Sequence, residues 1–187
     1  MKEGEKPSEE WSPLLRGSLI GQYEIKWNNN YWILYGEWLA APRDKKIFDA
    51  PKKIVVRQTG DSIIATVIEN GIICRNNLHI CVPKPNINIS FVLGVLNSKL
   101  TDFYYEFLNP EKGEALAEVK REHVIQLPVP FSSPEQQKPI IDLVDEILAA
   151  KKANPQADTS NEEAEIDRLV YALYGLSDDE INVVEGR

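Results

Sequence analysis

The sequence has few cysteines and no long apolar run. Its only cysteines among 187 residues are Cys74 and Cys81, too few for a disulfide scaffold and typical of a reducing compartment. No segment approaches the roughly 18 to 20 apolar residues that cross a bilayer. The polar, acidic start also differs from the basic and then apolar start of a signal peptide. We therefore expect a cytoplasmic protein with no membrane partner.

Metal-binding side chains are also scarce. Cys74, His79 and Cys81, with the distant His123, are of types that bind zinc, but no Cys-x-x-Cys spacing is present. We therefore predict no metal site.

Acidic residues outnumber basic residues, which gives the chain a net charge of −8. This balance disfavours nucleic acid, because phosphate binding normally leaves a basic footprint. The charge is unevenly distributed, however: residues 131–187 carry −8 and residues 1–10 carry −2, so residues 11–130 carry +2. A nearly neutral body can still present a basic face, although the acidic remainder would weaken unaided DNA binding.

A hairpin is predicted over Lys52–Val67. Two β-branched runs, Ile54–Val56 and Ile63–Val67, flank a polar turn that begins with Arg57 and Gln58. Arginine can bind the guanine edge or a phosphate in a bidentate manner, and glutamine can bind adenine. The residues alone leave a second interpretation open, an ordinary solvated hairpin tip.

The rest of the first half is predicted to be rich in strands and loops. Residues 1–10 have no apolar period and are expected to be flexible. A strand is expected within 11–25, and the aromatic residues of 27–38 favour sheet packing over base stacking. A basic loop with Arg43, Lys45 and Lys46 is expected over 41–51, and a further strand over 78–82.

The second half is predicted to be helical. Apolar residues recur at steps of three and four over 89–108, which predicts one helix with Ser90 as its N-cap. The prolines within 124–130 indicate an edge strand or a connector. Ser133-Pro134-Glu135-Gln136 is a capping-box helix start. A further helix over 164–174 should end at Gly175, and a short last helix should begin near residue 177.

Four motifs occur in an order typical of one family. They are Pro-Leu-Leu-Arg-Gly (13–17), Lys-Ile-Val-Val-Arg-Gln-Thr-Gly-Asp (53–61), Leu-Gly-Val-Leu-Asn-Ser-Lys-Leu (93–100), and Leu-Pro-Val-Pro followed by Pro-Glu-Gln-Gln (127–137). With them, residues 11–187 resemble the TaqI-like C-terminal specificity domain. That domain is the target recognition part of type IIG restriction-modification enzymes and adenine-specific DNA methyltransferases, and it is similar to half of a type I specificity subunit.

The resemblance implies an α+β fold: a β-rich recognition domain with a packed helix, followed by a C-terminal helical hairpin. The expected boundaries are a flexible leader at 1–10, a DNA target recognition domain at 11–131 and a helical spacer or dimerisation region at 132–187. The β-rich body would enter the DNA groove, and the helices would hold it at a set distance from catalytic domains.

The chain itself is not expected to be an enzyme or to need a cofactor. Asn109-Pro110-Glu111-Lys112 lacks the second proline and the aromatic residue of the family's methyltransferase motif. Glu118-Val119-Lys120 lacks the upstream Pro-Asp of a restriction nuclease core. The parent protein would be an adenine-specific methyltransferase or restriction endonuclease that uses S-adenosylmethionine and Mg²⁺.

Two functional hypotheses follow. In the first, the chain is a noncatalytic, sequence-specific recognition module of a type II restriction-modification enzyme, with double-stranded DNA and the methyltransferase or nuclease domains or subunit as partners. In the second, it is a helical protein-interaction module that docks a catalytic subunit or forms a homodimer through its C-terminal helices, without binding DNA. The first hypothesis assigns phosphate contacts to Lys45, Lys46, Lys52, Lys53 and Lys112, base contacts to Arg57, Gln58, Arg75, Asn76 and Asn77, and further DNA contacts to Arg16 and Arg43.

Overall fold

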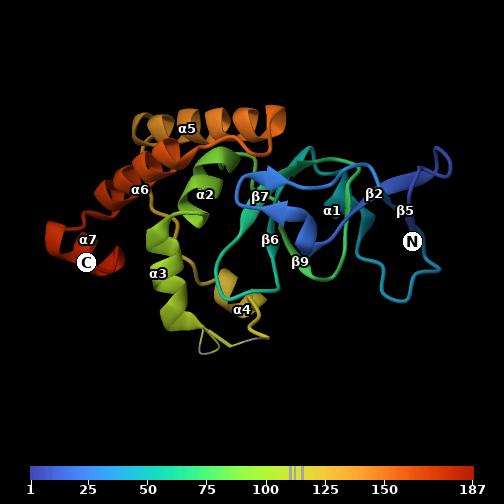
Figure 1. Ribbon diagram of the computed structural model, residues 1–187, viewed down its shortest axis with the longest axis horizontal. Coiled ribbons are helices and arrows are strands. Elements are labelled where there is room, and N and C mark those ends of the chain that lie inside the picture. The colour runs from blue at the N-terminus through green and yellow to red at the C-terminus, as the bar shows by residue number, and fades with distance from the viewer. Residues whose placement is uncertain (110, 112, 115) are drawn as a thin grey trace.

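A β-rich body and a group of helices lie side by side, so the fold is α+β as predicted (Figure 1). The computed structural model describes residues 1–109, 111, 113–114 and 116–187. The N-terminus lies at the outer end of the β-rich body, and the C-terminus lies at the far end of the helices.

The central sheet contains the predicted hairpin. Strand β6 (Lys52–Arg57) pairs antiparallel with β7 (Ala65–Glu69) on one side and with β9 (Leu78–Cys81) on the other. Residues Ile54, Val55 and Val56 are at most 1% exposed because both faces of the sheet are covered. Ile54 and Val56 face a core shared with the helices, whereas Val55 faces a second core in the β-rich body. Burial on both faces explains the uninterrupted apolar run.

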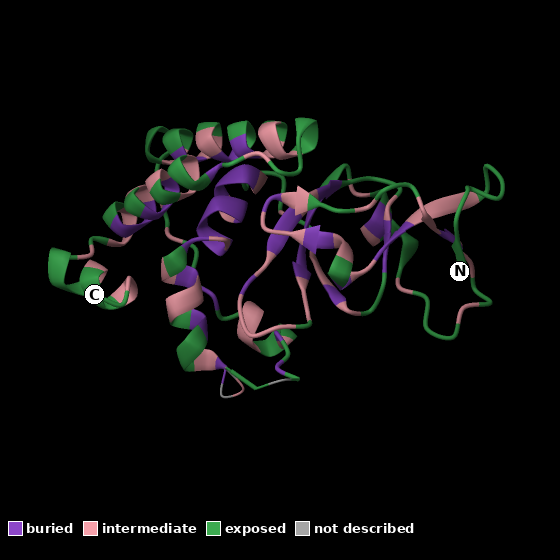
Figure 2. Cartoon of the chain, in the orientation of Figure 1, coloured by how far each residue is buried: buried purple, intermediate pink, exposed green. Residues whose placement is uncertain are grey.

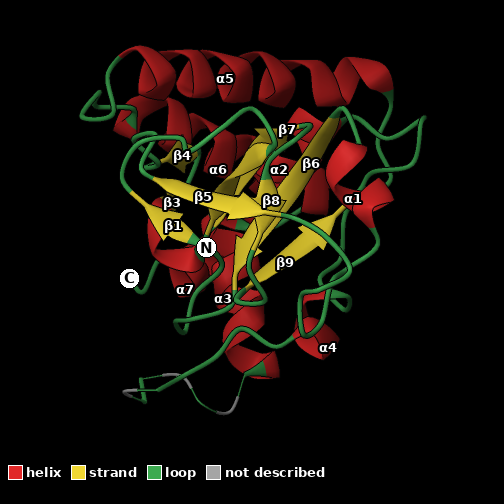
Figure 3. Ribbon diagram, turned by 90° about the vertical axis from the view of Figure 1, so that its right-hand side faces the viewer, coloured by secondary structure: helices red, strands yellow, loops and turns green. Residues whose placement is uncertain are grey.

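A second sheet lies across the first (Figure 3). It has the order β1 (Lys2–Glu3), β5 (Tyr31–Leu34), β2 (Trp11–Leu15), β8 (Ile73–Cys74). The β2–β8 pair is parallel. A small ladder joins β3 (Ile20–Gly21) to β4 (Glu24–Ile25), and a 3₁₀ turn, η1 (Gly17–Leu19), leads into it.

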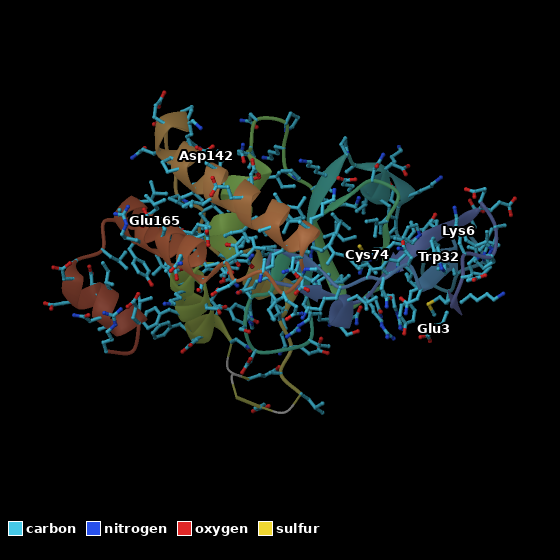
Figure 4. All side chains as sticks on the ribbon, turned by 45° about the horizontal axis from the view of Figure 1, so that its top comes forward. Glu3, Lys6, Trp32, Cys74, Asp142 and Glu165 are labelled. Atoms are coloured by element: carbon cyan, nitrogen blue, oxygen red, sulfur yellow. The ribbon has the colours of Figure 1, made fainter. Side chains whose placement is uncertain are left out.

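Part of the N-terminal segment is paired with the β-rich body. Lys2 and Glu3 pair with β5, and Trp32 Nε1 donates a hydrogen bond of 2.9 Å to Gly4 O. In Figure 4, Glu3, Lys6 and Trp32 lie together at this end of the molecule. Lys2 and Glu3, which lie in the segment expected to be flexible, thus pair with a strand of the β-rich body.

The helix predicted over 89–108 is two helices. These are α2 (Ile89–Leu96), capped by Asn88 rather than Ser90, and α3 (Lys99–Leu108). The Asn97 side chain lies between them and bonds both backbone groups of Ala65, accepting from its N at 3.1 Å and donating to its O at 3.0 Å. Asn97 thus binds the edge of β7 at Ala65, whose O also accepts a hydrogen bond of 3.0 Å from Tyr23 N, and α3 begins two residues after Asn97.

The remaining helices mostly follow the sequence expectation. The predicted loop over 41–51 contains α1 (Lys45–Asp49). Helix α4 (Arg121–Val124) leads into the predicted connector, and residues 125–130 form no strand. The predicted capping box begins α5 (Pro134–Ala153). Helix α6 (Ser160–Tyr174) ends at Gly175, whose φ is 69°, and α7 (Asp178–Val184) follows.

The C-terminal helices share a core with the β-rich body. Ile140, Val144 and Ile147 of α5 and Ile166 and Val170 of α6 are at most 1% exposed and belong to the same cluster as the inner face of β6. Buried residues accordingly run without a break from the sheet through α2 into α5 and α6 (Figure 2). The apolar stripes of these helices are covered by their own chain.

Candidate nucleic-acid interface

Three segments that are distant in sequence meet at one end of β6. The Asn77 side-chain oxygen accepts a hydrogen bond of 3.3 Å from Gly17 N, and the Asn77 carbonyl accepts one of 3.1 Å from Gln58 N. Asn77 therefore ties the first motif to the hairpin turn. Arg16 and Arg57 are brought to the same end of the body as a result.

The Arg57 side chain is held by its own turn. Its Nε donates a hydrogen bond of 2.8 Å to Thr59 O. A Cβ on Gly17 would lie 3.1 Å from Arg57 Cγ, and one on Gly60, whose φ is +126°, would lie 3.1 Å from Arg57 Nη2. The two glycines thus leave the space that the side chain occupies. Within the described chain, the terminal nitrogens of Arg57 make no hydrogen bond and remain able to bind a ligand.

Gln58 is engaged with a neighbouring segment. Its Nε2 lies 3.2 Å from a Glu118 carboxylate oxygen, and its carbonyl accepts a hydrogen bond from Val119 N at 2.6 Å. Lys120, which also belongs to the acid-x-Lys tripeptide, forms an ion pair with Glu111. The hydrogen bond from Lys120 is the main reason that the pKa of Glu111 is lowered. The tripeptide side chains therefore hold this segment in place.

Arg16 and Arg75 lie beside each other at the ends of two paired strands. Arg75 N donates a hydrogen bond of 2.9 Å to Leu15 O, and both arginines line one pocket of about 230 Å³. Arg16 Nη2 donates to the Tyr31 hydroxyl at 2.7 Å, with Cζ 4.2 Å from the centre of the Tyr31 ring. The role of Tyr31 was not predicted, because it appeared only as one of many aromatic residues in a strand-rich segment.

The prediction that Lys53 contacts phosphate is wrong. The side chain is 0% exposed, and Nζ donates to Phe48 O at 3.0 Å, Ala50 O at 3.3 Å and Glu69 O at 2.8 Å. Burial lowers the pKa of this ammonium group. Lys53 anchors the end of α1 to the sheet and is not accessible to DNA.

The other predicted lysines are separate from the arginines. Lys52 is exposed at the opposite end of β6, about 17 Å from Arg57 at the rise per residue of a strand. Lys45 and Lys46 are exposed on α1, and Arg43 Nη1 donates to Leu78 O at 3.1 Å. Asn76 is exposed beside Arg75, and Lys112 lies outside the described residues.

Other chemistry receives little support from the described part of the chain. It contains no group of three or more His, Cys, Asp or Glu side chains arranged to hold a metal ion. Burial raises the pKa of the Cys74 thiol to about 12, which keeps it protonated. None of the described helices has the length and apolar character to cross a membrane.

The comparisons with known proteins identify the class. Residues 12–129 match the model of the TaqI-like C-terminal specificity domain, and the chain belongs to this family of restriction-modification specificity domains. The fold is similar to that of the type IIL restriction-modification enzyme MmeI, solved in complex with DNA, with a TM-score of 0.61 and 13% identity. That match covers 91% of this chain and 29% of the MmeI chain. No curated protein matches.

Proposed function

We propose that this chain is the sequence-reading, noncatalytic DNA recognition module of a type II restriction-modification enzyme. The carrying observation is that Arg16, Arg57 and Arg75 gather at one end of the body without a carboxylate partner among the described residues. In a chain with a net charge of −8, such a group of arginines favours an anionic ligand. Family membership and the fold of a DNA-bound relative support duplex DNA as that ligand.

Arg57 is the proposed base reader. Its guanidinium is held at Nε by Thr59 O and retains both terminal nitrogens, the pair that can bind the O6 and N7 atoms of guanine. Gln58 and Asn76 are proposed neighbours in the groove. Asn77 is proposed to position them, because its oxygens already accept bonds from Gly17 and Gln58.

The exposed Lys45, Lys46 and Lys52 are proposed to contact phosphates along the body. Arg43 and Lys112 remain proposed DNA contacts of unspecified kind. Methyl transfer or cleavage, with S-adenosylmethionine and Mg²⁺, would belong to other domains of the parent enzyme. The alternative, a helical docking module that does not bind DNA, is not favoured, because the apolar stripes of α5 and α6 pack into the chain's own core.

The test is selection of bound duplexes from a randomised DNA pool, first at low salt and then at about 150 mM salt, where counterion release contributes less to nonspecific binding. We expect enrichment of a motif of a few base pairs that persists at the higher salt. Binding without enrichment would reduce the role to nonspecific phosphate contact. The absence of binding at both salt concentrations would refute the proposal for this chain.

A further inference from the structure

The arginine pair at the ends of β2 and β8 has a specific geometry. In this parallel pair Leu15 is the partner of Cys74, so Arg16 and Arg75 directly follow paired positions. Neighbouring strands lie roughly 4.8 Å apart, which places the two backbones side by side where the side chains begin. Both side chains line the pocket of about 230 Å³, together with Lys2, Glu3 and Tyr31.

The charges around this pocket are unbalanced. Lys2, Arg16 and Arg75 contribute three positive charges, and Glu3 is the one carboxylate among the lining residues. The Glu3 carboxylate accepts a hydrogen bond of 2.9 Å from the Tyr31 hydroxyl, which is the main reason that the pKa of Tyr31 is raised. Neither arginine forms an ion pair with a described residue. Adjacent like charges on neighbouring strands are destabilising by themselves, and a bound anion would remove that cost.

The two arginines differ in freedom. Arg16 is held against the Tyr31 ring and donates to its hydroxyl, so the direction of its guanidinium is fixed. Arg75 is exposed and makes no side-chain hydrogen bond to the described chain, so it can close on a ligand from the other side. Two arginines that line one small pocket suit the several oxygens of a phosphate group. A guanine edge, by contrast, is satisfied by one arginine.

We propose that Arg16 and Arg75 form a clamp for one backbone phosphate of duplex DNA, and that Arg75 does not read a base. This inference rests on the proposed function. The clamp would fix the position of the body on the duplex, while Arg57, connected to it through Gly17 and Asn77, lies toward the bases.

The test compares Arg75→Gln with wild type by fluorescence anisotropy on the selected duplex and on duplexes with each base pair of the motif changed. Lys152→Gln is the matched control, because it removes one exposed charge at the end of α5. We expect Arg75→Gln to weaken binding roughly ten- to a hundredfold on every duplex. It should also reduce the slope of log K against log salt by about 0.9, the value for one phosphate contact on B-DNA. Lys152→Gln should change neither quantity.

A second measurement identifies the phosphate. Duplexes with a single neutral methylphosphonate at successive positions should include one on which wild type binds at least as weakly as Arg75→Gln binds the unmodified duplex, because Arg16 also loses its ligand there. On that duplex the Arg75→Gln substitution should cost nothing more. The opposing result is that inorganic phosphate causes saturable shifts of the arginine side-chain NMR resonances while no methylphosphonate changes the DNA affinity. That result would assign the pocket to free phosphate and overturn the DNA assignment.

The outcomes separate the two proposals. Suppose that wild type binds DNA with an enriched motif and that Arg75→Gln loses only the discrimination at one base pair of that motif. This result would refute the clamp and leave the proposed function standing. An unchanged affinity and salt slope in Arg75→Gln would do the same. No DNA binding by wild type would instead refute the proposed function, and the clamp with it.

Discussion

Gly94 allows α2 and α5 to pack closely, and Gly94→Ala tests that packing. A Cβ at this position would lie 2.7 Å from Ile140 Cγ2 and 3.0 Å from Val144 Cγ2. Ordinary carbon contacts are about 3.5 to 4.0 Å. Both neighbours are 0% exposed, so neither can move its methyl group into solvent. The two helices would have to separate by a substantial fraction of an ångström.

Two effects oppose each other in this variant. Alanine is favoured over glycine in a helix by about 1 kcal/mol. Overpacking a well-filled core costs about 1 to 3 kcal/mol, and a contact as short as 2.7 Å points to the upper part of that range. We therefore expect Gly94→Ala to lower the free energy of unfolding by about 1 to 2 kcal/mol, measured by urea denaturation with far-UV circular dichroism.

A double-mutant cycle with Ile140→Ala provides the control. Ile140→Ala alone should cost about 2 to 5 kcal/mol, because it empties a buried site. In the Gly94→Ala background it should cost at least about 1 kcal/mol less, because the new methyl group gains room. Strict additivity, or a net stabilisation by Gly94→Ala, would show that the helices are not packed as closely as described.

Three further predictions concern polar side chains in or beside the core. Asn97→Ala should lower the free energy of unfolding by about 1 to 3 kcal/mol in urea denaturation, because Ala65 N loses its partner and Ala65 O keeps only the hydrogen bond from Tyr23 N; a loss below about 0.5 kcal/mol would contradict the role of Asn97 at this strand edge. Lys53→Met should cost about 3 kcal/mol by the same assay, since the carbonyls of Ala50 and Glu69 lose the Lys53 donor and that of Phe48 keeps only Gly71 N. Fluorescence anisotropy on the folded variant should find the DNA affinity unchanged, and a selective loss of affinity would restore the phosphate assignment. Burial raises the pKa of Asp167 above that of an ordinary aspartate, so the folded state holds this proton more tightly than the unfolded state. Between the two pKa values the free energy of unfolding of wild type should therefore fall as pH rises, relative to that of Asp167→Asn. Urea denaturation of both proteins from pH 4 to 6 measures this difference, and a difference that does not change with pH would contradict the prediction.

Features set by local interactions were predictable. The hairpin of β6 and β7 follows from β-branched runs around a polar turn, and the start of α5 follows from Ser133 and Gln136, whose reciprocal hydrogen bonds need no distant partner. The end of α6 likewise depends on Gly175, which adopts a left-handed conformation.

Features that depend on distant segments were missed. The apolar period continues across Asn97, but its hydrogen bonds to Ala65, 32 residues away, require a break between α2 and α3. Lysine is normally exposed, and nothing near Lys53 in the sequence shows that the carbonyls of Phe48 and Ala50 turn toward it.

The candidate site shows the same division. The sequence predicted Arg16, Arg57 and Arg75 as DNA-contacting residues, but the adjacency of Arg16 and Arg75 comes from the parallel pairing of β2 and β8. Strand pairing between segments about 60 residues apart leaves no local pattern in the sequence. For the same reason the sequence could not separate these arginines from Lys45, Lys46 and Lys52.

The most direct test of the central claim is to run the randomised duplex selection on wild type and Arg57→Ala in parallel. The account predicts that wild type enriches a short motif, and that Arg57→Ala loses discrimination at one base pair, worth about 1 to 3 kcal/mol, while the other positions persist. An identical motif from both proteins, or an equal loss of binding on every sequence, would contradict the assignment of Arg57 as a base reader.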